Sequence, residues 1–210
     1  MGSRPDAENM VNWESLGMSP EFMEKRFPGI AGKYKGLLIV IGGGRCVWDD
    51  LEKAGMAKNH NHDVLCINDI MMHYPGPIEH VYSNDHRWLP KWIAARRELL
   101  VRDYEPIKHS HSCVVGGKWT WPWPGHGTSA LNAVYTGLAL GYDEIWLCGV
   151  PLDNTGHYFD PPWIKSTFEA QVSMRENGLR YWSNAAKRIF NGKVKSFSGR
   201  TRDLLGEPKR

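Results

Sequence analysis

Short apolar segments alternate with longer amphipathic ones along the first half of the chain. Residues 36–41 read Gly-Leu-Leu-Ile-Val-Ile and are followed by three glycines. Such a run is typical of a parallel strand that is covered on both faces. Shorter runs at 63–68 and 80–83, each followed by polar residues, predict two more strands. Apolar residues near helical spacing predict helices over 47–57 and 89–101.

The alternation continues in the second half. Residues 112–115 and 144–150 predict strands, and residues 128–141 predict a helix that starts at a hydroxyl cap and stops at a glycine. A helical stretch over 164–190, with an interruption expected at its central glycine, leads to a last strand over 194–198. Strands that alternate with helices predict an α/β fold: a single doubly wound, mostly parallel Rossmann-like sheet with helices on both faces.

The 210 residues suit one domain, because a single core serves roughly 100 to 250 residues. We expect this Rossmann-like, nucleotide-binding domain to span residues 36–210. Residues 1–35 form an N-terminal extension that packs on it, with a short helix starting at Ser19-Pro20-Glu21. The expected apolar face of that helix consists of Phe22, Met23 and Phe27.

Composition and charge exclude several classes of protein. The chain is 41% hydrophobic without a run of roughly 18 apolar residues, and its first ten residues lack a secretory signal pattern. These features predict a soluble, cytoplasmic protein without a transmembrane segment. Four cysteines without a C-x-x-C pair are expected to be reduced core residues. The net charge of +3, from 26 basic and 23 acidic side chains, gives no strong signal for duplex DNA. The sequence also leaves open whether the protein forms a homo-oligomer.

Ten tryptophans are unusual for this length, and three lie in the segment 118–124, Lys-Trp-Thr-Trp-Pro-Trp-Pro. The prolines make it too irregular for a helix or a central strand, so an ordered loop is expected. Two interpretations remain open. The indoles either pack as a lid over an edge of the core, or form an aromatic platform with Trp163 at an acceptor or partner site.

Histidines and carboxylates give no metal-binding pattern. The pairs His60-Asn61-His62 and His109-Ser110-His111 lack the spacing of a helical metal site, and we expect exposed loop histidines. No Asp-x-Asp pair occurs, so the metal clamp of many sugar transferases is missing. No metal site is predicted.

Ligands of open parallel sheets bind beyond the carboxyl ends of the strands. Gly42, Gly43 and Gly44 follow the first strand directly, and Thr128 and Ser129 begin a later helix. Backbone amides at both places suit a phosphate, although a tight turn and a plain helix cap are the simpler alternatives. The glycine loop is a poor dinucleotide fingerprint, because Val47 replaces its third glycine, and no P-loop lysine follows.

Polar residues follow three other predicted strands. They are Asn68 and Asp69, then Asn84-Asp85-His86, and finally the segment from Gly149 to Asp153. Since the carboxyl ends of parallel strands share one edge, these residues together could hold a base and a ribose. Each alone is equally well explained as an Asx turn.

The segment from Gly127 to Val150 reads Gly-Thr-Ser-Ala-Leu-Asn-Ala-Val-Tyr-Thr-Gly-Leu-Ala-Leu-Gly-Tyr-Asp-Glu-Ile-Trp-Leu-Cys-Gly-Val. It resembles glycosyltransferase family 42, the bacterial sialyltransferases. Together with Lys33-Tyr34-Lys35-Gly36 it also resembles the related 6-hydroxymethylpterin diphosphokinase-like domains. The resemblance implies that the glycine loop and Asn68 contact a cytidine-nucleotide donor. It further implies that Thr128 and Ser129 hold the phosphate side, and that Gly149 to Asp153 approach the ribose and base.

Members of family 42 use a histidine as general base, and the resemblance points to His157, with His126 as the alternative. It also implies that Tyr158 hydrogen-bonds the leaving phosphate. The sequence departs from the family in its first loop, where Gly42-Gly43-Gly44-Arg45-Cys46 stands in place of Gly-Asn-Gly-Pro-Ser. The asparagine contact of that loop is therefore missing.

Taken together, the sequence predicts a metal-independent glycosyltransferase that uses a nucleotide-sugar donor, with a CMP-sugar implied by the resemblance. The acceptor hydroxyl could belong to a glycan, a small molecule or a modified nucleic-acid base. No cofactor is expected. One alternative is a diphosphokinase-like phosphotransferase, with Mg²⁺ held by Asp69, Asp85 and Asp153. The other is a non-catalytic module that binds carbohydrate or a partner protein.

Overall fold

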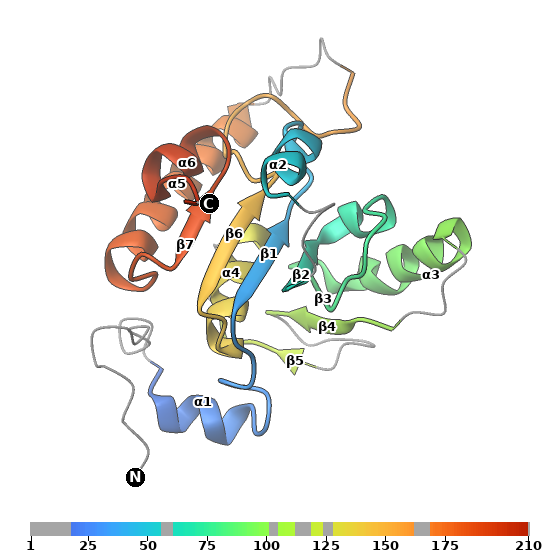
Figure 1. Cartoon of the computed structure of the whole chain (residues 1–210). Coiled ribbons are helices and arrows are strands. Elements are labelled where there is room, and N and C mark those ends of the chain that lie inside the picture. The colour runs from blue at the N-terminus through green and yellow to red at the C-terminus, as the bar shows by residue number, and fades with distance from the viewer. Residues whose placement is uncertain are drawn as a thin grey trace.

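A seven-stranded sheet, with every neighbouring pair parallel, runs through the part of the chain that the computed structural model describes (Figure 1). The described residues are 18–55, 61–100, 105–111, 119–123, 128–161 and 169–209. The strands are β1 (Leu37–Ile41), β2 (His62–Ile67), β3 (His80–Tyr82), β4 (Ile107–Ser110), β5 (Trp119–Thr120), β6 (Glu144–Cys148) and β7 (Val194–Ser196). Their spatial order is β5-β4-β3-β2-β1-β6-β7. The predicted α/β fold class is confirmed.

Helices cover both faces of this sheet. They are α1 (Pro20–Arg26), α2 (Val47–Lys53), α3 (Leu89–Leu100), α4 (Ser129–Leu140), α5 (Glu169–Arg188) and α6 (Gly199–Leu205), with 3₁₀ turns η3 (Asn68–Met72) and η4 (His86–Trp88). Side chains of β1 alternate between two cores: Leu38 and Val40 pack with α1, α4 and α5, whereas Ile39 and Ile41 pack with α2, η3 and α3. A strand buried on both faces explains the continuous apolar run.

The strand order reverses between β1 and β6. The chain builds β1 to β5 outward on one side, and then returns through α4 to place β6 against the free edge of β1. Ile41 and Cys148 are paired at the carboxyl ends of these two strands. The loops that follow them therefore diverge around a crevice, which is where open α/β sheets bind ligands.

Helix α1 lies in the predicted position but buries a narrower face than expected. Ser19 caps it by accepting the amide of Phe22, with Pro20 at the start. Met23 and Phe27 are buried in the same core as α4, but Phe22 is 43% exposed. The prediction for Phe22 is wrong because successive residues lie about 100° apart around a helix, so neighbours cannot share one narrow face.

The edge of the sheet beyond β3 differs from the prediction. Strand β4, Ile-Lys-His-Ser, was not predicted because three of its four residues are polar, yet it pairs with β3 and buries His109. The expected strand 112–115 lies outside the described residues. Trp119 and Thr120 form the short edge strand β5 inside the expected loop. Pro122 comes two residues after the end of β5, in keeping with the exclusion of proline from strand interiors.

The tryptophans after β5 belong to the core. Trp121 and Trp123 are 0% and 3% exposed, and their rings stack with centroids 5.3 Å apart. Each indole N–H is satisfied, Trp121 donating to His109 and Trp123 to Thr136. These two rings therefore pack over an edge of the core. The alternative prediction, an aromatic platform at an acceptor or partner site, is wrong for both of them. Trp163 lies outside the described residues.

Two histidines lie at the centre of a buried hydrogen-bond network, so the expectation of an exposed loop histidine is wrong for His109. Trp121 donates to Nδ1 of His109, whose Nε2 lies 3.1 Å from Nδ1 of His80. Nε2 of His80 lies 3.0 Å from the hydroxyl of Tyr142, which donates to Asp63. An indole N–H only donates and a carboxylate only accepts, so every proton in this His80–His109 network points towards Asp63.

The C-terminal part holds one long helix and one unpredicted short helix. Helix α5 runs unbroken through Gly178, so the expected interruption is wrong. Helix α6 follows β7 directly, and its sequence is too short to show a clear period.

Cys66 and Cys148 are buried and Cys46 is half-buried, all three as free thiols, while Cys113 lies outside the described residues. In the described part of the chain, no helix is both long enough and apolar enough to cross a membrane.

Candidate functional site

A cavity of about 470 Å³ lies at the carboxyl ends of β1 and β6, where the strand order reverses. It is lined by ten of the residues singled out from the sequence: Gly42, Gly43, Gly44, Asn68, Asp69, Thr128, Ser129, Gly149, Asp153 and His157. Tyr158 does not line it, and His126 lies outside the described residues. Segments up to 115 residues apart in sequence thus share one cavity, of a size usual for small ligands.

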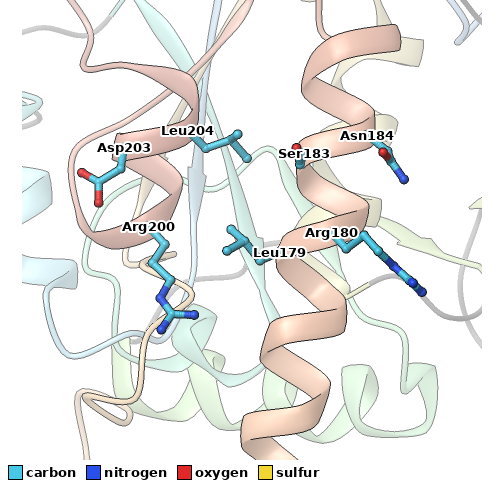
Figure 2. A pocket seen from close by; sticks show the side chains of 7 residues that line it. All are labelled: Leu179, Arg180, Ser183, Asn184, Arg200, Asp203 and Leu204. Atoms are coloured by element: carbon cyan, nitrogen blue, oxygen red, sulfur yellow. The ribbon is translucent and has the colours of Figure 1, made fainter.

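A second hollow, of about 590 Å³, lies between α5 and α6. Figure 2 shows Leu179 and Leu204 pointing towards each other between the helices, while Arg180 and Asn184 project from the other side of α5. This groove contains none of the residues predicted to bind ligand. Its Ser183 therefore offers a control position for substitutions in the β1–β6 cavity.

The glycine loop after β1 packs closely against the loop after β6. The amides of Gly42 and Gly44 donate to the carbonyls of Cys148 and Gly149, both at 2.8 Å. A Cβ on Gly44 would lie 2.5 Å from Cδ of Pro151. These two glycines are therefore required by packing, and their amides are not available to a ligand. In the described part of the chain, the amide of Gly43 has no protein partner, so it is the one that can bind an anion.

The N-terminus of α4 opens into the same cavity. Thr128 caps the helix by accepting the amide of Leu131 at 3.1 Å, and the hydroxyl of Ser129 accepts the amide of Asn84 at 3.4 Å. The first amides of a helix have no partner within it, and here those of Ser129 and Ala130 belong to residues that line the cavity. With the helix dipole, they form a second place for an anion.

Asn68 occupies a left-handed backbone conformation, with φ of 58°. Its Oδ1 accepts from the hydroxyl of Ser83 at 2.8 Å, and that hydroxyl in turn accepts the amide of Asp85. Leu152, another lining residue, also has a positive φ of 50°. Two non-glycine residues in this sparsely populated region are typical of binding sites, where surrounding structure holds the strain.

The two carboxylates in the cavity differ in their surroundings. Asp153 accepts from both the amide and the hydroxyl of Thr155, so its side chain makes the Asx turn that the sequence left open. Asp69 lines the opposite wall, after β2. Asp85 lies outside the cavity and is paired with Arg87 at 2.8 Å.

His157 reaches the cavity because its loop is bonded to the glycine loop. Gly44 and His157 form an antiparallel bridge, Arg45 donates its amide to Gly156 at 3.2 Å, and Tyr158 donates its amide to Gly43 at 3.0 Å. The imidazole is 54% exposed. Its Cδ2 would lie 3.7 Å from a Cβ on Gly43, so one edge of the ring faces the glycine loop.

Tyr158 lies beside the cavity and packs into the core on the α2 side. Its ring meets Trp48 and His73 edge-on, at centroid distances of 6.1 and 5.3 Å. Burial, and secondly the charge of Asp69, raise the pKa of Tyr158 to about 12. Its hydroxyl therefore stays protonated at neutral pH and can only act there as a hydrogen-bonding group.

The described lining carries no lysine or arginine side chain. An anionic ligand would be held by amides, hydroxyls and His157, against the charges of Asp69 and Asp153. Within the described residues, no three His, Cys, Asp or Glu side chains gather as a metal site. Those two aspartates are the groups that could share a cation with a bound phosphate.

Asp50 stabilises the loops around the cavity without lining it, and its role was not predicted from the sequence. It is fully buried, and its carboxylate accepts the amide of Gly149 at 2.9 Å and the hydroxyl of Ser198. It thereby joins α2 to the segments that follow β6 and β7. The available signal was its helical position, three residues after Val47 and directly before Leu51, on the apolar face of α2.

Asp50→Ala is expected to lower the free energy of unfolding by roughly 3 kcal/mol, because the buried amide of Gly149 and the partly buried hydroxyl of Ser198 lose their acceptor. Asp49→Ala, on the exposed side of the same turn, is the matched control and should cost less than about 1 kcal/mol. Urea unfolding of both variants measures the difference. Equal stability of the two would show that Asp50 does not hold the loop after β6.

The site thus rests on the convergence of the β1 loop, the start of α4, the loop after β6 and His157 in one cavity. Arg45, Asp50 and Asp160 support it without lining it. No family model, curated protein or solved structure matches this chain.

Proposed function

We propose that this protein is a glycosyltransferase that binds a nucleotide-sugar donor in the β1–β6 cavity and transfers the sugar to an acceptor hydroxyl. The observation that carries the proposal is that the Gly43 amide, the start of α4 and His157 line one cavity. A cytidine donor is favoured by the resemblance to family 42. The resemblance and the cavity are independent arguments, since one rests on sequence and the other on geometry.

In this mechanism the phosphate of the donor lies between the amide of Gly43 and the first amides of α4. His157 takes the proton of the acceptor hydroxyl through an imidazole nitrogen. The acceptor oxygen bonds to the anomeric carbon as the bond from that carbon to the phosphate oxygen breaks. The leaving phosphate keeps the electron pair, and the positive end of α4 stabilises its charge.

A diphosphokinase-like reaction is the second candidate, because Asp69 and Asp153 line the cavity. They would hold Mg²⁺ against the phosphates of ATP or GTP, which would compensate for the absence of lysine and arginine in the described lining. Asp85 has no part in this candidate, because it lies outside the cavity, paired with Arg87.

Thermal denaturation with nucleotides, with and without EDTA, tests the proposal. At a hundred times its Kd, a ligand adds about 3 kcal/mol to the stability, which raises Tm by roughly 6 to 10 °C in a domain of this size. We expect such a rise with CMP or CDP, unchanged by EDTA. Stabilisation only by ATP or GTP with Mg²⁺ would favour the diphosphokinase. No shift with any nucleotide would contradict both.

Ser129→Ala is expected to reduce the CMP-induced rise in Tm by at least about half, because it removes a hydroxyl from the lining. Ser183→Ala, in the groove between α5 and α6 (Figure 2), is the matched control and should keep the full rise. The same thermal measurement serves both variants. A loss of the rise in the Ser183 variant alone would place the ligand in the other groove.

A further inference from the structure

We propose that Arg45 and Asp160 are positioning residues for His157. Together they hold the imidazole with its Nδ1 proton towards Asp160 and its Nε2 lone pair free on the cavity side. That this arrangement prepares His157 to act as a general base rests on the proposed function. The arrangement itself can be tested in the free protein.

Arg45 holds both ends of the loop that carries His157. Its guanidinium donates through Nε to the carbonyl of Thr155 at 2.8 Å and through Nη2 to the carbonyl of Pro161 at 3.0 Å. One carbonyl precedes His157 and the other follows it. The forked, planar guanidinium reaches the two carbonyls from two separate nitrogens. Because Arg45 directly follows Gly44, the glycine loop and the His157 loop are fixed to each other.

Asp160 fixes the ring within that loop. Its Oδ2 accepts the backbone amide of His157 at 2.8 Å and lies 3.5 Å from Nδ1. The hydrogen bond from the His157 amide, and then the charges of His157 and Arg45, keep the pKa of Asp160 below its ordinary value. The carboxylate is therefore ionised at neutral pH and can only accept. A neutral imidazole facing it carries its proton on Nδ1.

The rest of the ring is oriented by its neighbours. Phe159 stacks on it in parallel, with centroids 5.1 Å apart and planes 6° apart. The Cδ2 edge faces Gly43, and both residues line the cavity. With Nδ1 turned to Asp160, the unprotonated Nε2 remains for an acceptor hydroxyl. An imidazole that is 54% exposed would otherwise rotate freely, and fixing it reduces the entropy cost of proton transfer.

Nitrogen-15 NMR of the His157 ring, at a pH where it is neutral, reports which nitrogen carries the proton. We expect the Nδ1–H form in the wild-type protein. In Asp160→Ala no acceptor remains for a proton on Nδ1, so the Nε2–H form, which a free imidazole prefers, should dominate. Asp203→Ala, an exposed change on α6, is the control and should leave the ring unchanged. An unchanged ring in Asp160→Ala would overturn the role of Asp160.

Hydrogen exchange tests Arg45. In Arg45→Met neither carbonyl is held, and the amide of Tyr158, which donates to Gly43, should exchange at least about ten times faster. Core amides of β1 should be unaffected. Equal protection of Tyr158 in the variant and the wild type would overturn the role of Arg45.

The outcome is separable from the proposed function. Neither Arg45 nor Asp160 lines the cavity, and the NMR and exchange measurements on their variants need no ligand. If no nucleotide stabilises the wild-type protein, the glycosyltransferase proposal fails while the NMR and exchange results still decide the positioning.

Discussion

Gly44→Ala is expected to lower the free energy of unfolding by roughly 2 to 3 kcal/mol, whereas Gly43→Ala leaves the fold stable and removes ligand binding. A Cβ on Gly44 would lie 2.5 Å from Cδ of Pro151 and 2.7 Å from the carbonyl oxygen of Gly149. The carbonyl and the proline ring both belong to the loop after β6, which would have to move away from β1. Urea unfolding measures this loss.

Gly43→Ala is the matched variant, one residue away. The nearest side-chain atoms to its Cβ would be those of Tyr158 and His157, at 3.6 and 3.7 Å, which is ordinary van der Waals contact. Neither position has a positive φ, so the backbone tolerates alanine at both. Stability should therefore change by less than about 1 kcal/mol.

The added methyl in Gly43→Ala would stand beside the free amide, between the glycine loop and His157. We expect it to remove the CMP-induced rise in Tm. If Gly44→Ala were as stable as Gly43→Ala, the two loops would not be packed as described. If Gly43→Ala kept the full rise, the ligand would not use the Gly43 amide.

The alternation of apolar runs and amphipathic segments was enough to predict the fold class. Strand β1 is apolar throughout, and β6 is apolar after its first residue, because both of their faces are covered, so their signal is local. Strand β4 has no such signal. Its His109 is buried only because His80, from β3, and Trp121, from the segment after β5, supply hydrogen-bond partners. A pattern that depends on distant partners cannot be seen along the sequence.

The same distinction applies to the site. Asn68 was predicted from the rule that ligands bind at strand carboxyl ends, Thr128 from the start of a helix, and His157 from the resemblance to family 42; all three line the cavity. Which amides remain free was not predictable. It depends on β6 lying against β1, which uses the amides of Gly42 and Gly44 in backbone hydrogen bonds. Strand order is a property of the whole fold.

The protein is expected to lose about 3 kcal/mol or more of stability as the pH falls from 6.5 towards 4, because of the His80–His109 network. Burial lowers the pKa of His80 from 6.5 to about 4, although the charge of Asp63 opposes the shift. Burial lowers the pKa of His109 as well. The unfolded chain therefore binds protons first, and stability that is complete above pH 6.5 is lost below it.

The direction of the hydrogen bonds gives the structural reason. His109 donates from Nε2 to Nδ1 of His80, since its own Nδ1 accepts from Trp121. A proton added to Nδ1 of His80 would set two N–H groups against each other in a site with 0% exposure. The protonated network cannot keep its hydrogen bonds, so the folded protein binds these protons more weakly than the unfolded chain does.

Urea unfolding measured between pH 7.5 and 5 separates the contribution of these two histidines to stability from the contribution of most carboxylates. Glu105 and Asp85 have lowered pKa values, so their contribution is lost only at more acidic pH. The pKa of Glu79 is raised by burial, so its protonation stabilises the folded state as the pH falls and works in the opposite direction. Each buried histidine should contribute a slope of about 1.4 kcal/mol per pH unit once the pH is well below 6.5.

His80→Gln is the variant that separates this explanation from general acid sensitivity. A side-chain amide can accept from His109 and donate to Tyr142, so it keeps the direction of the hydrogen bonds without titrating. The slope of stability against pH should fall by about 1.4 kcal/mol per pH unit, the share of one buried histidine, while His109 and His111, whose pKa values burial also lowers, keep theirs. A wild-type stability that stays constant from pH 7.5 to 5 would mean that both rings take up protons without disturbing the fold. That result would contradict a network in which Trp121 can only donate and Asp63 can only accept.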